Sequence, residues 1–288
     1  MSLLGRWPGV KAENVFRTRP ESLTMSAEQN SAINERNPTV AATGDGPDLA
    51  VVVPVHNETE NLRSLIFEIS TALENVASFE IIYVDDASVD ETPVTLRALE
   101  KDVPELRVIT HKTCYGQSMA IATGVQAARA AVIATLDGDG QNDPADIPAL
   151  YARYLQSDQP DLLMVAGWRA KRKDSGLKKI SSRIANRVRG GLLGDGTPDT
   201  GCGLKIFSRT AFLDMPRFDH MHRFLPALMI RRGGKVVSVK VNHRPRQQGV
   251  SKYGLWNRLW VGIVDMFGVM WLNRRAKVVE LKDDKDSR

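Results

Sequence analysis

The stretch 132-VIATLDGDGQNDP-144 joins a run of apolar residues to two carboxylates that flank a glycine. An unbroken run of β-branched and apolar residues is typical of a strand that is buried on both faces. The run ends at Asp137, and Asp139 follows two residues later. In open α/β sheets, ligands bind at the carboxyl ends of the strands. The stretch therefore predicts a buried strand with a candidate ligand site at its end.

The same arrangement occurs twice upstream. Residues 49-LAVVVPV-55 pass into 56-HNET-59, and 79-FEIIYV-84 pass into the acidic segment 85-DDASVD-90. Alternating apolar strands and amphipathic helices predict an α/β fold with a mostly parallel sheet, whose acidic strand ends lie on one edge. The further predicted elements are helices over 60–77, to about 101 and over 116–129, and strands over 106–110 and 131–137.

The composition excludes several classes of protein. The chain has 288 residues, 42% hydrophobic and 25% charged, with a net charge of +5, which is ordinary for a globular protein. Its longest apolar run, 259–272, contains Asp265 and falls short of the roughly 20 residues that span a bilayer. Cys114 and Cys202 have no metal-like spacing and favour a reduced, cytoplasmic compartment. The early residues do not have the pattern of a signal peptide.

The acidic strand ends are suited to a nucleotide site that uses a metal ion. The chain has no G-x-G-x-x-G after its first strand and no G-x-x-x-x-G-K-[ST], which disfavours dehydrogenases and P-loop NTPases. One carboxylate can bind a base or ribose, while another holds Mg²⁺ or Mn²⁺ against a diphosphate. An extended backbone would place Asp137 and Asp139 on one side, and the missing Cβ of Gly138 would let a ligand approach closely.

Three motifs, PVHNE at 54–58, DDASVD at 85–90 and DGDGQNDP at 137–144, resemble the motif series of the family 2 glycosyltransferases with the GT-A fold. They are most similar to those of the polyprenyl-phosphate sugar synthases, the group of dolichol-phosphate mannose synthase and its bacterial relatives. That group usually has Ala where this chain has Gly138. The resemblance covers about residues 49–255. It implies a three-layer GT-A fold, an inverting sugar transfer and a divalent cofactor, Mg²⁺ or Mn²⁺.

The resemblance also implies a role for each matching position in the donor site. His56 stands where the family commonly has Tyr; it either touches the base or is an ordinary loop histidine. Asp139 is implied in catalysis. The residues implied in nucleotide-sugar binding are Pro54, Asn57, Glu58, Asp86, which would contact the base, and Asp137, and those implied in metal binding are Asp137, Asp139 and Gln141.

A phosphate acceptor requires cations more than it requires a base. A phosphate monoester is largely a dianion at neutral pH and can attack an anomeric carbon without a dedicated base. Cationic groups must position it and offset its repulsion from the donor diphosphate. The segment 244-RPRQQGVSKYG-254 resembles the R-x-x-G-x-S-K motif of the synthases, and 167-GWR-169 matches their G-S-R stretch. The implied acceptor-phosphate ligands are Arg169, Arg246, Ser251 and Lys252, of which Arg169 and Arg246 are also implied in catalysis.

Two segments have the pattern of a helix that lies in a membrane interface. Residues 168–190 hold nine Lys or Arg against the single acid Asp174, and apolar positions recur at helical spacing over 177–193. Trp256, Trp260, Phe267 and Trp271 can share another helical face, which basic residues follow. These stripes either contact a membrane or pack against protein. We expect peripheral association with the cytoplasmic face of the inner membrane.

Together these patterns predict four parts of the chain. They are a disordered N-terminal extension over 1–47, a GT-A domain over 48–245, an acceptor loop and membrane-interface helix over 246–276, and a charged tail over 277–288. The expected donor is GDP-mannose or a UDP-sugar, between which the sequence does not decide. Absence of a Q-x-x-R-W motif favours transfer of a single sugar.

Two alternative functions stay open. The acceptor could be a hydroxyl of a glycan or glycolipid, which requires a base, and Asp195 and Asp199 are the nearby candidates. The chain could also be a non-catalytic, membrane-associated module that binds nucleotide sugars. Nucleic-acid binding through 168–190 is disfavoured, because few aromatic residues interleave with its charges.

Overall fold

The computed structural model describes residues 46–170, 190–245 and 255–277, without the side chains of 255–260. The strands are β1 (Leu49–Val55), β2 (Phe79–Asp85), β3 (Leu106–Thr110), β4 (Val132–Thr135), β5 (Leu163–Trp168), β6 (Lys205–Ser208) and β7 (Lys235–Lys240). The α-helices are α1 (Thr59–Leu73), α2 (Thr92–Asp102), α3 (Gln117–Ala127), α4 (Ile147–Leu155), α6 (Arg209–Leu213), α7 (Leu225–Arg231) and α8 (Leu255–Arg274). Short 3-10 turns are η3 (Pro144–Asp146), η4 (Pro160–Leu162) and η5 (Met221–Arg223).

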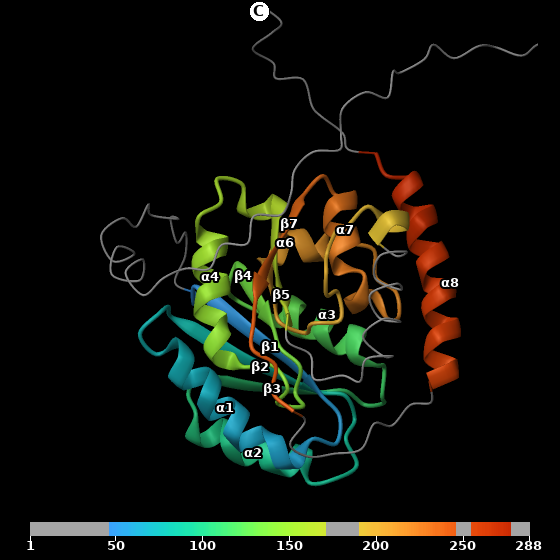
Figure 1. Cartoon of the computed structure of the whole chain (residues 1–288). Coiled ribbons are helices and arrows are strands. Elements are labelled where there is room, and N and C mark those ends of the chain that lie inside the picture. Colours follow the sequence, from blue (N-terminus) through green and yellow to red (C-terminus); the bar gives the residue numbers. More distant parts are fainter. Residues whose placement is uncertain (1–45, 171–189, 246–254, 278–288) are drawn as a thin grey trace, which may run out of the picture. The chain divides into compact units, whose positions relative to one another are not determined.

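One sheet of seven strands, in the order β3-β2-β1-β4-β6-β5-β7, organises the described chain (Figure 1). Every pairing is parallel except those of β6, which runs antiparallel to both β4 and β5. The carboxyl ends of β1, β2, β4 and β5 therefore share one edge, and the start of β6 lies at that edge too. The prediction of a mostly parallel sheet with clustered acidic strand ends is confirmed.

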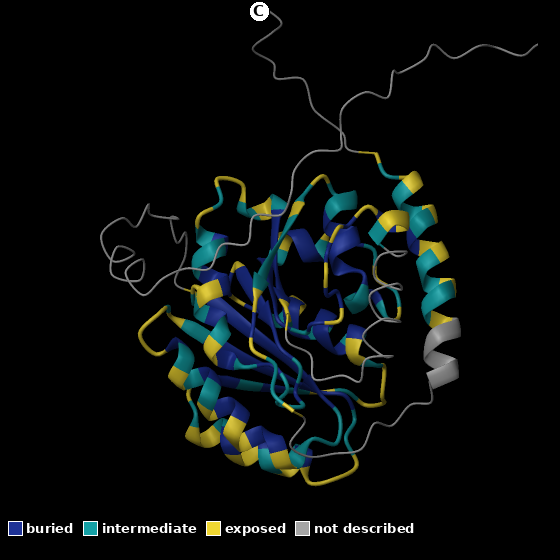
Figure 2. Ribbon diagram, viewed as in Figure 1, coloured by how far each residue is buried: buried dark blue, intermediate teal, exposed yellow. Residues whose placement is uncertain are grey.

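Helices cover both faces of the sheet, which explains why the central strands β1, β4 and β6 are buried along their whole length. All seven residues of β1 are buried. Its residues Leu49, Val51 and Val53 pack in one core cluster with α1, α2 and α4. Ala50 and Val52 belong to a second cluster with α3, α6 and α7. Figure 2 shows the central strands buried between the helices. The fold thus has three layers.

The predicted elements agree with the structure best in their centres. The strands over 49–55 and 106–110 have the predicted bounds, whereas the helix predicted over 60–77 spans Thr59–Leu73. The strand predicted over 131–137 ends at Thr135, because the chain turns at 138–139 directly after it. None of the helices in the described ranges is both long and apolar enough to cross a bilayer.

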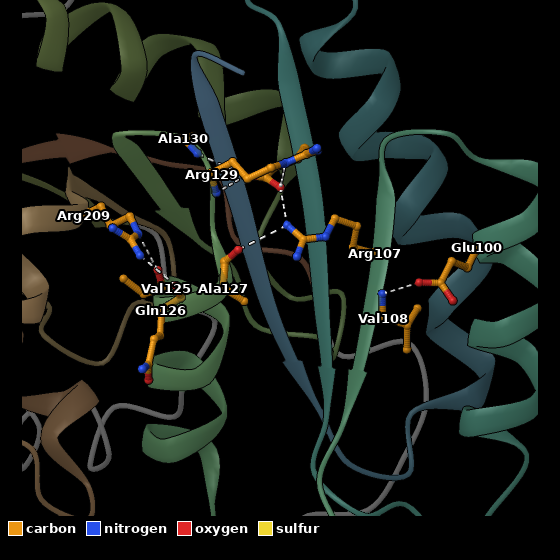
Figure 3. A network of polar contacts seen from close by, with 10 residues as sticks. Glu100, Arg107, Val108, Val125, Gln126, Ala127, Arg129, Ala130 and Arg209 are labelled. Carbon is orange, nitrogen blue, oxygen red and sulfur yellow. Dashed lines mark hydrogen bonds and ion pairs between the residues drawn. The ribbon is translucent and has the colours of Figure 1, made fainter. Parts of the chain in front are cut away.

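A buried carboxylate at the amino end of β2 ties three segments of the chain together. Glu80 accepts hydrogen bonds from the backbone N–H groups of Arg129 (2.6 Å) and Ala130 (3.1 Å), and from the guanidinium of Arg107 at 2.9 Å. Arg107 also donates to the carbonyl of Ala127 at the end of α3 (Figure 3). Burial alone would raise the pKa of Glu80, but these hydrogen bonds outweigh it and hold the pKa below its usual value. Glu80 thus links β2 to β3 and to the segment after α3, at the sheet edge opposite the acidic strand ends.

Replacing Glu80 by Gln should lower the free energy of unfolding at pH 7 by about 2–3 kcal/mol, because two backbone donors and a guanidinium lose a charged acceptor. A depressed pKa stabilises the fold above the unfolded-state pKa, and this contribution disappears as pH falls through the lower folded-state pKa. Urea denaturation of both proteins should therefore show a difference at pH 7 that shrinks in acid.

Arg97→Gln is the control for this experiment. It removes a partly exposed pair with Glu100 at 3.2 Å and should change stability by less than about 0.5 kcal/mol. Equal stability of Glu80→Gln and the unmodified protein at pH 7 would contradict the role assigned to Glu80.

Candidate active site at the carboxyl edge of the sheet

The loops after β1 and β2 are hydrogen-bonded to each other. Asn57, in the left-handed region with φ 56°, receives a hydrogen bond on Oδ1 from the backbone of Val89 at 2.8 Å and donates its own N–H to Ser88 Oγ at 2.8 Å. The backbone N–H of Glu58 donates to Thr92 Oγ1 at 3.0 Å. Two of the predicted nucleoside-binding residues, Asn57 and Glu58, thus lie beside the DDASVD loop, while Pro54 is buried within β1.

Asp86 is buried, and its carboxylate organises the segment that leads into α3. It accepts hydrogen bonds from the backbone N–H groups of Tyr115 (2.8 Å) and Gly116 (2.7 Å) and lies 2.7 Å from Nδ1 of His111. Burial alone would raise its pKa, but the partners around it, His111 foremost, hold the pKa below its usual value. Asp86 is therefore ionised at neutral pH. The Nδ1 atom of His56 lies 2.8 Å from the carbonyl oxygen of Asp86. This contact is compatible with an ordinary loop histidine.

Asp137 lies at the centre of this edge, in contact with two loops. Gln117, the first residue of α3, donates from Nε2 to Asp137 Oδ1 at 2.8 Å. Gly203 passes so close that a Cβ there would lie 2.3 Å from the Asp137 carboxyl carbon. Burial, and then the charge of Asp139, raise the pKa of Asp137 to about 6, against the opposing charges of Lys205 and Arg169. Asp137 and Asp139 thus form an acidic pair whose mutual repulsion a cation would relieve.

The chemistry of this acidic pair fits a divalent metal. Mg²⁺ and Mn²⁺ prefer oxygen ligands and are commonly held by one or two carboxylates plus substrate phosphates. Asp137 and Asp139 provide such oxygens, and Asp139 Oδ1 also accepts the backbone N–H of Gln141 at 3.1 Å. Within the described residues, no group of three or more His, Cys, Asp and Glu side chains forms a complete protein cage. The pair is therefore suited to a metal that is shared with ligand phosphates.

Gly138 has another role than the sequence indicated. Its Cα faces β1, since a Cβ there would lie 2.4 Å from Val55 Cγ1 and 3.0 Å from the carbonyl of Pro54. The residue is buried and lies in a turn with Asp139, so the backbone between the two carboxylates is not extended. The missing side chain lets the turn pack on β1, and it does not open a path for a ligand as we expected.

Arg169 and Asp199 form a buried ion pair next to Asp137. The guanidinium donates to both carboxylate oxygens, from Nε at 2.7 Å and Nη2 at 2.9 Å. The Arg169 side chain is only 9% exposed. Burial alone would lower the pKa of Arg169, but Asp199 raises it above its usual value, so the group stays charged. Asp199, one of two candidate bases for a hydroxyl acceptor, is thus committed to a cation; the other, Asp195, is buried.

Sequence reasoning missed three residues of this site. Gln117 and Gly203 contact Asp137 directly, and Lys205 is buried at the start of β6, where its ammonium donates to the carbonyl of Cys202. A lysine that opens the buried strand KIFS is a signal that sequence could have offered, because a buried cation requires a partner. Gln117 and Gly203 gave no signal, since their role depends on how two distant loops meet at Asp137.

The chain that leaves β7 is attached to the turn after the acidic pair. Asn142 and His243 form an antiparallel bridge, and the backbone N–H of Arg244 donates to the carbonyl of Gln141 at 3.1 Å. Arg244 also pairs with Asp143 at 2.7 Å and with Glu68 on α1. Residues 243 and 244, which precede the predicted acceptor loop, therefore lie beside the turn that follows the acidic pair. Arg246, Ser251 and Lys252 lie outside the described residues.

A family model described as "Glycosyl transferase family 2" matches residues 50–215, which include strands β1 to β6, apart from the first residue of β1, and the acidic edge. The chain belongs to this family. A dodecaprenyl-phosphate galacturonate synthase of Rhizobium johnstonii is 36% identical over 232 residues, 79% of this chain and 68% of that protein. An undecaprenyl-phosphate 4-deoxy-4-formamido-L-arabinose transferase of Enterobacter is 33% identical over 207 residues, 71% and 62% of the two chains. The chain thus spans about two thirds of the length of these curated relatives.

Solved structures agree with the fold. Glucosyl-3-phosphoglycerate synthase of Mycobacterium tuberculosis, in complex with Mg²⁺ and uridine diphosphate, has a TM-score of 0.60 at 14% identity and covers 90% of this chain and 86% of that chain. A mannosyltransferase of Pyrobaculum calidifontis, in complex with GDP-mannose and Mn²⁺, has a TM-score of 0.58 at 18% identity, with 88% and 72% covered. The fold of this family member is the GT-A fold, as the motifs predicted.

Replacing Asp137 by Asn should stabilise the metal-free protein at pH 7.5 by about 2 kcal/mol. The folded-state pKa of about 6 exceeds the usual 3.8, so the charged carboxylate costs stability, and this cost grows as pH rises from about 4 to 6. Thermal or urea unfolding in EDTA at pH 4 and pH 7.5 measures it, and the difference should be absent at pH 4.

The exposed Asp158 offers a control, since Asp158→Asn should leave stability unchanged at both pH values. A destabilised Asp137→Asn variant at pH 7.5 would show that the attraction of Lys205 and Arg169 outweighs the burial of the carboxylate.

Proposed function

We propose that this glycosyltransferase moves one sugar from a nucleotide-diphosphate sugar to a polyprenyl phosphate, with inversion at the anomeric carbon. The observation that carries the proposal is the acidic pair of Asp137 and Asp139 with the charged Arg169 beside it at one sheet edge. The names of the two curated relatives describe transfer to, or synthesis on, a polyprenyl phosphate, which supports the same acceptor class here.

The donor half of the reaction belongs to the loops after β1, β2 and β4. Asn57, Glu58 and Asp86 are proposed to hold the nucleoside, with the Asp86 carboxylate kept ionised by its partners. Asp137 and Asp139, with Gln141, would hold Mg²⁺ or Mn²⁺, which when bound neutralises the charge of the leaving diphosphate. Gln117 fixes the orientation of Asp137 through its hydrogen bond at 2.8 Å. The base and the sugar, GDP-mannose or a UDP-sugar, stay undecided.

The acceptor half needs positive charge. One oxygen of the acceptor phosphate would attack the anomeric carbon as the bond to the donor diphosphate breaks, and no proton has to be removed from a dianion. Arg169 would attract that phosphate, and Asp199 holds its guanidinium in place through two hydrogen bonds. Arg246, Ser251 and Lys252 are proposed to complete the acceptor site. A hydroxyl acceptor is less favoured, because both oxygens of Asp199 accept hydrogen bonds from the Arg169 guanidinium, which makes Asp199 a poor base.

A lipid acceptor places the enzyme at a membrane, and we propose peripheral association with the cytoplasmic face. The support is α8, where Phe267 and Trp271 are 61% and 62% exposed while Val269 on the opposite side is 1% exposed. The apolar residues Phe267 and Trp271 therefore do not pack on the protein core. The side chains of Trp256 and Trp260, and the basic stripe at 171–189, lie outside the described residues.

The test is transfer of labelled sugar to a short polyprenyl phosphate from a panel of UDP- and GDP-sugars, with Mg²⁺ or Mn²⁺. Asp139→Asn should lower the rate at least about 100-fold, since one charge of the acidic pair is lost. Asp158→Asn, an exposed change of the same kind, should retain full activity.

Three results would decide against the proposal. Transfer to a soluble hydroxyl acceptor without lipid product would favour the glycan reaction. Binding of nucleotide sugar without turnover would favour a binding module. An Asp139→Asn variant of undiminished rate would remove Asp139 from the site.

A further inference from the structure

A basic pocket of about 300 Å³ lies where α7, α8 and η4 meet. Its lining residues are Leu162, Arg231, Arg232, Ala276 and Lys277. Leu162 directly precedes β5, and Arg232 precedes β7, so the pocket lies at the amino ends of these strands. The acidic pair lies at the other edge of the sheet. The basic pocket is therefore a separate feature from the proposed donor and acceptor sites.

The two arginines of the basic pocket are held in place by the protein. Arg232 donates to Asp214 from Nε (3.2 Å) and Nη2 (2.8 Å), and to the carbonyl of Asp161 from Nη1 at 2.7 Å. Arg231 donates from Nε to the carbonyl of Leu272 near the end of α8, at 3.2 Å. Such contacts fix the guanidinium groups before any ligand arrives, which lowers the entropy cost of binding.

Positive charge in the basic pocket exceeds the negative charge near it. Three cations line it, and among the described residues the carboxylate of Asp214 is the one that forms an ion pair with any of them, namely Arg232. Cations are favoured at helix carboxyl ends, which accounts for Arg231 beside Leu272. It does not account for Lys277, which has no acidic partner among those residues and lies beyond the end of α8. Arginine and lysine together in a hollow are suited to a phosphate group.

The surface next to the basic pocket indicates where that phosphate comes from. Val261, Val264, Phe267 and Trp271 are exposed along one side of α8, and Arg274 and Arg275 follow them, also exposed. Figure 2 shows exposed positions recurring along this helix up to its end. Exposed apolar side chains followed by basic residues at a helix end are suited to the headgroup region of an anionic bilayer. A phosphate group at that end of α8 would then come from a lipid.

We propose that the basic pocket binds the phosphodiester of an anionic phospholipid headgroup while the exposed side of α8 lies on the bilayer. Arg231 and Lys277 contact the phosphate, and Arg232 supplies charge while Asp214 and Asp161 orient it. The acyl chains extend along the apolar side of α8. The site anchors the end of α8 that is remote from the chemistry, and it takes no part in sugar transfer. It rests on the proposed function only in that the protein works at a membrane.

The test compares binding to vesicles of phosphatidylcholine with and without phosphatidylglycerol, using the full chain. Arg231→Gln with Lys277→Gln should weaken binding to the anionic vesicles about ten- to thirty-fold, as expected for two cations near an anionic surface. Lys277→Gln alone should weaken it several-fold, and Lys277 has no hydrogen bond or ion pair within the described residues for this change to disturb. Sugar transfer to a short, detergent-dispersed polyprenyl phosphate should be unchanged in both variants.

A matched control removes two exposed cations elsewhere. Arg97→Gln with Lys101→Gln on α2 lowers the net charge equally and should leave vesicle binding within about twofold of the unmodified protein. Equal losses in the two double variants would show that charge acts without a site, and would overturn the proposal. Undiminished binding of the pocket variants would overturn it too.

A free anion is the remaining source of phosphate. Inorganic phosphate that protects the protein against unfolding, with this effect lost in the pocket variants while their vesicle binding is retained, would assign the pocket to a soluble ligand and overturn the proposal. Vesicle binding does not depend on turnover, so a protein that transfers no sugar at all would contradict the proposed function and leave this test intact.

Discussion

The contact between the Asp137 carboxylate and the backbone at Gly203 is the constraint on which the site depends. It holds the partly buried carboxylate of Asp137 beside a second acid, Asp139, and the cost appears as a pKa of about 6. The surrounding structure limits this cost with the Gln117 amide and with the charges of Lys205 and Arg169. The repulsion between the two carboxylates is what the divalent metal proposed above would relieve.

The antiparallel strand β6 is what brings these opposing charges together. Since β6 runs against β4 and β5, its start and the loop before it lie at the carboxyl edge. That loop carries Asp199, which holds Arg169 at the end of β5, and Gly203, which touches Asp137 at the end of β4. A fully parallel sheet would have placed the start of this strand at the opposite edge. The one reversal in the sheet therefore supplies the charges that the acidic strand ends lack.

The sequence predicted the fold and the acidic edge well, because both follow from short-range patterns. Buried strands over 49–55 and 79–85 are readable from unbroken apolar runs, and parallel pairing then brings their ends together. The contacts within the site were not readable in this way. Gln117 reaches Asp137 over twenty residues, and Gly138 faces β1 and not a ligand, because tertiary packing decides both. Roles that rest on the resemblance, such as those of Arg246 and Lys252, stay predictions.

Contacts between residues 242–244 and residues 141–146 connect the segment after β7 to the turn that follows the acidic pair. Asn142 and His243 form a bridge, and Arg244 forms ion pairs with Asp143 and Glu68. These contacts hold the two segments and α1 together. A substitution in one segment requires a matching substitution in the other if these contacts are to be preserved. Exchanging the proposed acceptor loop for that of a relative would therefore require residues 141–146 and Glu68 of α1 to be exchanged with it, so the exchangeable unit is discontinuous in the chain.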